Sequence, residues 1–557
     1  MNSRKDLKLV RFVLILGVLL CFSGSLAAAA GDVAGHPATE ALRLGELMYR
    51  NGVLPSGKPL QAIAQGDLKL HGKMVTCANC HMKGGLGSFE GWVLTPPTNG
   101  VKLYAPLRSG SDLPGSGMAR GQLEFPRPAY TDESLAKALR AGIDPSGRIL
   151  KETMPRYILD DRDMEIFIYY LKNLSSHFPP GVTDNEVRFA TVVTADVSAQ
   201  DRDAMLEPLK AYIRNEWNVS LPVLRQLQRD SSYRSLSLDV WELKGPAATW
   251  REQLDSLHRR QPVFGLLGGI SSGTWVPVHE FCEMNKIPCI LPVTDLPAAS
   301  GSDGYTLYFS KGYYQEGETA AKYLGRVFDF PQDGQIIQVY RDNVQGRALA
   351  QGFADVWKKL GTAVMKNRII SDSEKTGRDF WKGLSAAYPK AALLLWLGPE
   401  DLDGSAELAE TGDRPALVFV SSTMLKGALP LIPESIRDLT FITYPNRLPE
   451  EAAFPRSSVE QWLRVRNILT TDLTISSKMY FLSRMLGMVL TDMRGNFYQD
   501  YFLDLFDSLE DQAGTVAAYP RLSFGPGQRY ASKGCYVVRL STGPQPKIIR
   551  LSDWVIY

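Results

Sequence analysis

The carboxyl-terminal two thirds of the chain alternate short apolar runs with longer amphipathic segments. Apolar runs of this length, separated by helical segments, are typical of buried strands in a parallel sheet. The alternation therefore predicts α/β architecture, and residues 187–557 are too many for one ordinary doubly wound domain, so we expect two α/β lobes. The clearest runs are VRFATVVTAD (187–196), VFGLLGGI (263–270), PCILPV (288–293), QIIQVY (335–340), ALLLWLG (392–398) and ALVFVSS (416–422).

The amino-terminal 30 residues have the layout of a secretory signal peptide. A basic stretch precedes an apolar run from Phe12 to about Phe22, and small residues end at Ala30. The apolar run is too short to cross a bilayer comfortably. We expect cleavage near Ala30 and a periplasmic location, with membrane attachment only if this segment stays uncleaved.

The charge balance of the remaining chain excludes one class of partner. Without residues 1–30 the chain has 58 basic and 59 acidic residues. A nucleic-acid-binding protein would show a basic excess. We therefore expect no nucleic-acid partner.

Residues 76–82 read TCANCHM and contain the pattern C-x-x-C-H. No second pair of zinc ligands lies near Cys77, and no strand precedes it as in a thioredoxin-like dithiol. In an exported protein this pattern predicts covalent attachment of one haem c. Cys77 and Cys80 would bond the haem vinyl groups, and His81 would be the proximal ligand of the iron.

A sixth ligand is predicted at Met154, because it is followed by Pro155 on an irregular segment before a strongly helical one. That helix is expected to be capped by Asp160 and to bury Met164, Phe167, Ile168 and Leu171. An ordinary core methionine is the alternative interpretation of Met154. Rival ligands are Met74, Met82, Met118, His71 and His177.

Taken together, residues 38–176 resemble a class I cytochrome c domain, which is an all-α fold. Gly45 and Tyr49 resemble the small and aromatic pair of the family's first helix, which packs on an aromatic face of the last one. A middle helix is expected in YTDESLAKALRAG, from a cap at Thr131 to a stop at Gly142. The resemblance further implies that the carbonyl of Pro96 or Pro97 orients the proximal histidine. Two departures from the compact pattern are an insertion before Cys77 and a long loop over 99–130.

The boundaries that follow are a signal peptide over 1–30, a cytochrome domain over 31–178, a linker over 179–186 and a two-lobed domain over 187–557. The linker carries Pro179-Pro180-Gly181, which breaks regular structure.

The segment 187–557 resembles type I periplasmic binding proteins of the branched-chain amino-acid receptor kind. The likeness is carried by GLLGGISSGTWVPVHEFCEMNKIPCILPVTD, YFSKGYYQEGETAAKYL, IIQVYRDNVQGRALAQGF and the closing GQRYASKGCYVVRLSTGPQPKIIRLSDW. It implies a solute held between two lobes by hydroxyls and backbone NH groups at helix starts. The positions that match are Ser271, Ser272, Thr274, Thr294, Tyr313 and Tyr314. The alternative is that the serines only cap a helix, and candidates for an amine-binding acid are Glu316, Asp342 and Glu400.

Cysteine usage adds one further expectation. Cys282 and Cys289 flank a helix end and a strand start, so a disulfide between them is plausible in an oxidising compartment. Cys535 is then the odd thiol, expected to be buried in a strand.

The function expected from these features is electron transfer by a single-haem cytochrome with a solute-binding-like domain. Its partner would be a periplasmic dehydrogenase or a terminal acceptor. The alternative is a transporter-type receptor or sensor for an amino acid or small carboxylate, with the haem domain reporting ligand binding. We expect no enzyme, because no nucleophile, base and acid set is present and Met154 argues against an open iron site. A haem enzyme such as a peroxidase is a third, less favoured possibility.

Overall fold

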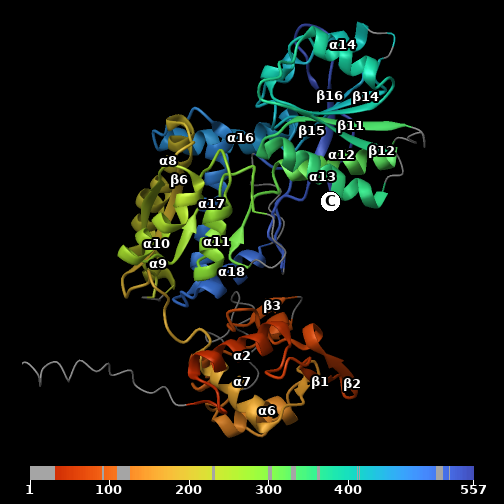
Figure 1. Cartoon of the computed structure of the whole chain (residues 1–557). Coiled ribbons are helices and arrows are strands. Elements are labelled where there is room, and N and C mark those ends of the chain that lie inside the picture. The colour runs from red at the N-terminus through yellow and green to blue at the C-terminus, as the bar shows by residue number, and fades with distance from the viewer. Residues whose placement is uncertain are drawn as a thin grey trace, which may run out of the picture. The chain divides into compact units, whose positions relative to one another are not determined.

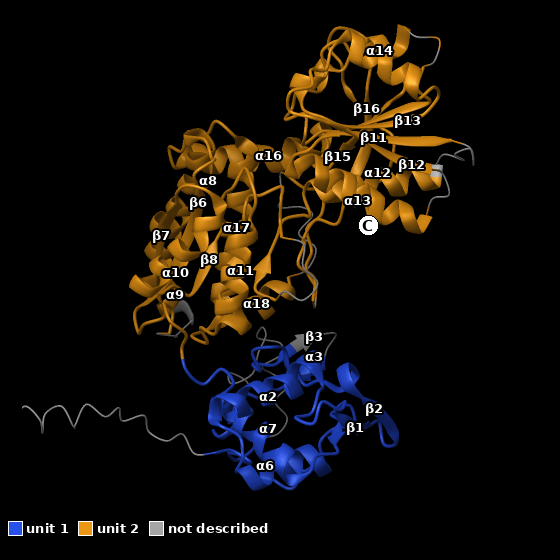
Figure 2. Ribbon diagram, viewed as in Figure 1, with its two compact units in different colours: residues 1–177 blue, residues 178–557 orange. Residues whose placement is uncertain are grey.

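The computed structural model separates the chain into two compact units, residues 1–177 and 178–557 (Figure 2). The described residues are 32–90, 93–108, 126–228, 232–298, 304–327, 334–360, 364–410, 412, 414–509, 518–525 and 527–556. The expected signal peptide and Met118 lie outside these ranges. Within them, no helix combines the length and apolar character needed to cross a membrane.

The first unit is built from helices around small antiparallel sheets (Figure 1). Its helices are α2 (Ala38–Asn51), α3 (Ala78–His81), α4 (Gly100–Leu103), α6 (Asp132–Ala141) and α7 (Asp161–Asn173). Its strands are β1 (Gln61–Ala64), β2 (Leu68–His71), β3 (Ser88–Glu90), β4 (Val93–Thr95) and β5 (Arg156–Tyr157). The expectation of an all-α unit is therefore corrected. The insertion before Cys77 folds into the hairpin β1–β2, and β1 also pairs with β5.

Local signals define the ends of two helices of this unit as expected. The Thr131 hydroxyl accepts a hydrogen bond from Ser134 N, and Gly142 ends α6 in the left-handed conformation. The Asp160 carboxylate accepts from Asp163 N at the start of α7. These side chains satisfy NH groups that the first helical turn leaves unpaired.

Helices α2 and α7 pack together and form the centre of the unit's core. The rings of Tyr49 and Tyr170 lie 5.6 Å apart between centroids. The predicted apolar face of α7 is confirmed, since Met164, Phe167 and Leu171 are buried in one cluster with Cys77.

The first lobe of the second unit is a five-stranded sheet in the order β10-β9-β8-β6-β7, with every pairing parallel. Its strands are β6 (Glu186–Thr194), β7 (Ser235–Leu243), β8 (Gly265–Leu267), β9 (Cys289–Ile290) and β10 (Thr306–Leu307). The accompanying helices are α8 (Ala199–Tyr212), α9 (Asn218–Gln228), α10 (Trp250–Arg260) and α11 (Val276–Asn285). Residues 179–186 are not a free connector: Arg188 N donates to Gly181 O, and Gly181 lies against the backbone of Phe264.

The second lobe is a larger sheet in the order β12-β11-β13-β14-β15-β16-β17, with β18 paired to β16. Its strands are β11 (Gln335–Arg341), β12 (Val364–Ile370), β13 (Ala392–Trp396), β14 (Leu417–Ser421), β15 (Thr440–Tyr444), β16 (Gly534–Leu540), β17 (Ile548–Arg550) and β18 (Val555–Ile556). Its helices are α12 (Tyr313–Val327), α13 (Val344–Leu360), α14 (Arg378–Ala387) and α15 (Glu407–Glu410). Figure 1 places α12 and α13 on one face of this sheet and α14 on the other. Alternate residues of β11 accordingly enter two separate clusters, Ile336 on one side and Ile337 on the other.

The chain passes between the lobes more than once, and this brings distant segments together. After β15 come α16 (Pro449–Val465), α17 (Leu473–Met493) and α18 (Gln499–Asp507). Helix α17 belongs to the first lobe, because Ser476 Oγ donates to Ala204 O of α8 and a side chain at Gly268 would meet Met479. The chain then returns to the second lobe as β16, antiparallel to β15, and the expected closing hairpin is β16–β17.

Candidate functional sites

The C-x-x-C-H segment forms the single-turn helix α3, with Cys77 as its first flanking residue. Cys77 and His81 are buried, whereas Cys80 is exposed. Helix α2 holds the end of the segment, because Tyr49 OH donates to Met82 O at 2.9 Å. The segment is thus fixed against the α2–α7 core with one thiol on the inside and one on the outside.

The imidazole of His81 is oriented by a backbone carbonyl. Its Nδ1 lies 2.7 Å from Pro96 O. A carbonyl oxygen only accepts, so Nδ1 carries the hydrogen and the neutral ring presents its Nε2 lone pair. Burial lowers the pKa of His81, and the Pro96 carbonyl opposes that shift. The resemblance did not decide whether Pro96 or Pro97 orients the histidine. In the structure Pro96 makes the contact.

Tyr157 is a partner of Cys77 that the sequence did not reveal. Its hydroxyl donates to Val75 O at 2.9 Å and lies 3.3 Å from Cys77 Sγ. Burial raises the pKa of Cys77 to about 12, which keeps the thiol protonated in the absence of a reaction partner. Tyr157 lies on β5, so only its pairing with β1 brings it to this place.

Met154 is partly buried and packs against the same hydrophobic cluster that contains Cys77. Its loop is tied together by Arg156, whose guanidinium donates to Leu150 O at 2.7 Å and to Met154 O. Among the rivals within the described ranges, the Met74 side chain is 57% exposed. His71 and His177 are exposed as well.

These residues fit a covalently bound haem. The two thiols, the histidine with a free Nε2 lone pair and a thioether on a fixed loop are the donor set that such a group needs. Cys77 and Cys80 would hold the group covalently, and His81 and Met154 would be the residues to bind its iron. The orienting carbonyl on His81 is the accompanying contact expected of a metal-binding imidazole.

In the second unit, the residues predicted to hold a solute gather only in part. Ile270 and Val293 pair in parallel beyond β8 and β9, so Ser271 and Thr294 follow at neighbouring strand ends. Both hydroxyls are used in local turns: Ser271 Oγ accepts from Gly273 N and Thr294 Oγ1 from Leu296 N. Ser272 is exposed.

Ser271 and Ser272 do not cap helix α11, so the alternative interpretation of these serines is wrong. Helix α11 begins at Val276 after Trp275, with no side-chain cap at that position. Thr274 Oγ1 accepts from Val276 N and so satisfies one NH of the first turn. The serines lie in the loop before this turn.

The two tyrosines at the entry of α12 face different surroundings. Tyr313 is buried, and its backbone N donates to Asp295 O at 3.1 Å. Tyr314 OH donates to Asp355 Oδ2 of α13 at 2.8 Å, so this tyrosine joins two helices of the second lobe.

Of the three candidate amine-binding acids, Glu316 has the most unusual environment. It is fully buried on α12, and Thr443 Oγ1 donates to its Oε2 at 2.7 Å. Burial raises the pKa of Glu316 to about 7, against the opposing effect of nearby hydroxyls. Asp342 is paired with Arg347 on the surface instead.

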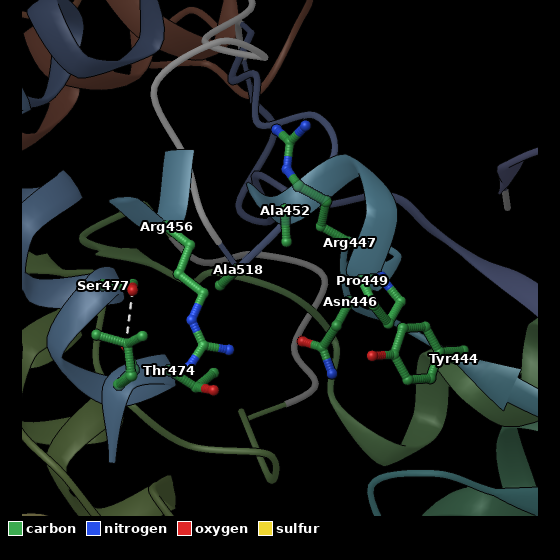
Figure 3. A pocket seen from close by; sticks show the side chains of 10 residues that line it. Tyr444, Asn446, Arg447, Pro449, Ala452, Arg456, Thr474, Ser477 and Ala518 are labelled. Carbon is green, nitrogen blue, oxygen red and sulfur yellow. Dashed lines mark hydrogen bonds between the residues drawn. The ribbon is translucent and has the colours of Figure 1, made fainter. Parts of the chain in front are cut away.

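A cavity of about 250 Å³ lies where the chain leaves the second lobe. Figure 3 shows side chains from the end of β15 and the starts of α16 and α17 around it. Its lining residues are Tyr444, Asn446, Arg447, Pro449, Ala452, Arg456, Leu473, Thr474, Ser477 and Ala518. None of the six residues predicted to hold a solute is among them.

Several polar groups of this cavity are available to a ligand. Among the described residues, no hydrogen bond is recorded for Tyr444 OH, the Asn446 amide or the Thr474 hydroxyl, although Tyr444 and Asn446 are half-buried. Polar groups in such positions normally find a partner. A sequence signal did exist: TFITYP is an apolar run ending at a proline, and ligands of parallel α/β sheets gather at the carboxyl ends of strands.

Cys282 and Cys289 are free thiols in this structure, so the possible disulfide is corrected. Both are buried and their side chains interact by a hydrogen bond. Burial raises the pKa of Cys282 well above its ordinary value, with Cys289 adding to the shift. Cys535 is buried in β16, as expected.

Residues 237–457 match the family model described as periplasmic binding protein. No curated protein matches the chain. The solved structures it resembles include a fatty acid ABC transporter substrate-binding protein from Thermomonospora curvata, at 14% identity and a TM-score of 0.46, covering 68% of this chain and 95% of that one. Another is an ABC transporter substrate-binding protein from Sphaerobacter thermophilus, at 14% identity and a TM-score of 0.48, covering 67% and 98%. A branched-chain amino acid ABC transporter protein from Thermus thermophilus with bound valine is 9% identical with a TM-score of 0.45, covering 67% and 97%.

The second unit combines a match to a family model with two sheets, one parallel and one mixed. Residues 178–557 form two α/β lobes, and the part of them over 237–457 matches the periplasmic binding protein model. The family description names binding rather than catalysis, in agreement with the prediction of a protein that is not an enzyme.

Proposed function

We propose that the second unit is a receptor for a small solute, which it binds in the cavity between β15, α16 and α17. The observation that carries this proposal is the convergence of polar groups without a hydrogen bond among the described residues, namely Tyr444 OH, the Asn446 amide and the Thr474 hydroxyl, on one concave space. A few convergent polar groups in a concave site are the usual form of a small-ligand site. Two lobes joined by crossing segments are also suited to hinge closure around a ligand.

The test is a thermal-shift screen of the full chain against amino acids and small carboxylates, followed by calorimetric titration of each hit. A ligand at 100 times its dissociation constant should add about 2.7 kcal/mol to the free energy of unfolding. Asn446→Ala should weaken binding at least tenfold. Asn185→Ala is the matched control, since Asn185 is exposed and does not line the cavity. If Asn446→Ala binds the solute as tightly as the parent does, the solute binds at a site other than this cavity.

A second function, electron transfer by the first unit, is favoured by the contact between His81 Nδ1 and Pro96 O. When bound, haem would supply an iron that cycles between two oxidation states. In that role Cys77 and Cys80 anchor the group, while Pro96 keeps the His81 ring in one orientation. Met154, on the loop tied by Arg156, would supply a second ligand to the iron and so favour electron transfer over peroxidase-type chemistry.

Covalent attachment is tested by the double variant Cys77→Ser, Cys80→Ser in a strain able to mature c-type cytochromes. Haem that resists denaturing electrophoresis should be lost in the variant and present in the parent. Met154→Ala should convert the iron to high spin or to another ligand, whereas Met74→Ala, at an exposed methionine, should leave the spectrum unchanged. Retained covalent haem in the double cysteine variant would contradict the assignment.

Export to the periplasm follows from the same proposals, because both haem attachment and solute capture belong to that compartment. Amino-terminal sequencing of the protein purified from the periplasm should give a first residue near Gly31.

If a solute is found, repeating the redox titration with and without it will show whether the first unit reports binding. A redox partner in the same compartment, such as a dehydrogenase, is part of this proposal.

A further inference from the structure

The cavity at the ends of β15, α16 and α17 has a distinct charge character. Among the residues that the structure describes, its lining contains two arginines, Arg447 and Arg456, and no aspartate or glutamate. An ammonium group entering the cavity would therefore meet no carboxylate among these described side chains. An isolated buried charge without a partner is strongly disfavoured.

Arg456 lines the cavity from α16. In Figure 3 its guanidinium extends toward Thr474. Its Nε donates to Glu460 Oε1 at 2.9 Å, and no further hydrogen bond of this side chain is recorded among the described residues. The terminal nitrogens therefore remain available as a planar fork, which matches the geometry of a carboxylate.

The side chain of Arg447 binds backbone carbonyls and does not extend into the cavity in the same way. Its Nη2 donates to Tyr519 O at 2.9 Å and to Pro520 O at 3.3 Å, which fastens the returning chain. Figure 3 accordingly shows its guanidinium directed away from Asn446 and Thr474. The anion-binding function thus belongs to Arg456, with Arg447 closing one side of the cavity.

Described acids near the cavity already have partners, and Glu460 pairs with Arg456 itself. Asp472 caps α17 by accepting from Ile475 N, and Glu451 accepts from Tyr536 OH. Burial raises the pKa of Tyr444, and Glu450 adds to that rise, so the phenol stays protonated and able to donate. Two helices also begin at the cavity, α16 at Pro449 and α17 at Leu473, and their amino-terminal dipoles favour negative charge.

We propose that the cavity selects a small carboxylate that lacks an ammonium group, with Arg456 as its charge partner and Asn446, Thr474 and Tyr444 as its hydrogen-bond donors. This inference rests on the proposed solute-receptor function and narrows it to one class of solute. The volume of about 250 Å³ suits a molecule no larger than a short mono- or dicarboxylate. Amino acids are disfavoured, because no carboxylate among the described residues lines the cavity to pair with their ammonium group.

The experiment is calorimetric titration of the full chain with acetate, lactate and succinate, and separately with leucine, valine, phosphate and sulfate. At least one carboxylate should bind, and the amino acids and inorganic anions should bind at least tenfold more weakly. Arg456→Gln should weaken carboxylate binding at least tenfold, and Arg456→Lys should weaken it less. Arg464→Gln is the matched control, because Arg464 is an exposed arginine of the same helix outside the cavity.

The outcomes separate the inference from the function beneath it. Carboxylate binding that depends on Arg456 and not on Arg464 supports both. Amino-acid binding that is unaffected by Arg456→Gln overturns the inference and leaves a solute receptor. Preference for phosphate or sulfate overturns the carboxylate assignment alone. Absence of binding by every solute overturns both, and since Arg456 is on the surface, thermal unfolding of the variants will verify that they are folded.

Discussion

Gly45 on α2 lies directly against Tyr170 on α7: a β-carbon built on Gly45 would stand 2.3 Å from the Tyr170 β-carbon. No contact of that length is tolerated, so the two helices approach this closely only because residue 45 has no side chain. The same helix carries Tyr49, whose hydroxyl holds the backbone after His81. The close contact between α2 and α7 therefore also fixes the position of Tyr49, which holds the candidate haem segment.

Gly45→Ala should destabilise the first unit by about 1–3 kcal/mol, the usual cost of overpacking a tight contact. Amide hydrogen exchange in α2 and α7 will measure this loss of stability. Gly383→Ala on α14 is the control: it is also a helical glycine but has open space around it, so it should gain about 0.5–1 kcal/mol from helix propensity. Equal effects at both positions would mean that the α2–α7 contact is looser than described.

Arg156→Gln should loosen the loop that carries Met154. The substitution removes donors to Leu150 O and Met154 O, and because these carbonyls are only partly buried the loss should cost about 1 kcal/mol. Hydrogen exchange of residues 150–154 should accelerate. In the haem-loaded protein, the absorption band of methionine-bound low-spin iron should weaken. Arg162→Gln, at an exposed arginine with one long bond to Ala34 O, should change neither signal.

The stability of the second unit should fall as pH rises between about 4.5 and 7 because of Glu316. Burial raises the pKa of Glu316 from 4.5 to about 7, so the folded state binds this proton more tightly than the unfolded state. The contribution is fully present below pH 4.5 and lost as pH passes 7. By linkage it amounts to about 3 kcal/mol.

Denaturant unfolding across this pH range will measure that slope, and Glu316→Gln should flatten it. Glu207→Gln, at an exposed carboxylate paired with Lys210, should leave the slope as in the parent. A slope unchanged by Glu316→Gln would assign the pH dependence to other groups.

Cys282 and Cys289 should both react with an alkylating reagent once the protein is unfolded without reductant, because they are free thiols. In the native protein neither should react, since both are buried and the thiol of Cys282 has a raised pKa. Mass spectrometry of tryptic peptides will show which cysteines are alkylated before and after unfolding. Cys535 serves as control, because it is buried and reacts on unfolding in either case. A linked peptide joining residues 282 and 289 would show that the pair oxidises after export.

How far the fold was predictable depends on the range of the interactions. The caps at Thr131 and Asp160 and the apolar face of α7 follow from residues within a few positions of each other, and each was predicted correctly. The hairpin β1–β2 is local but was missed, because each of its strands has only four residues and no apolar run. Its pairing with β5 was missed because more than two helices separate β1 from β5 along the chain. The edge strand β7 was also missed, because it has no continuous apolar run.

The candidate sites divide in the same way. C-x-x-C-H is a local spacing and could be recognised directly, whereas the choice between Pro96 and Pro97 needed the observed carbonyl contact. The cavity around Asn446, Arg456 and Thr474 combines three segments that meet only where the chain crosses between lobes. No periodicity in one segment carries information about the other two.

The sequence by itself determined the parallel α/β character of residues 187–557, the helix ends of the first unit and the C-x-x-C-H spacing, because these depend on near neighbours and on hydrophobic pattern. The tertiary structure decided which carbonyl orients His81, that Tyr157 contacts Cys77, that Glu316 is buried, and which side chains share the cavity. Those features arise from closing long loops, and the closure brings together groups whose separation along the chain leaves no local pattern.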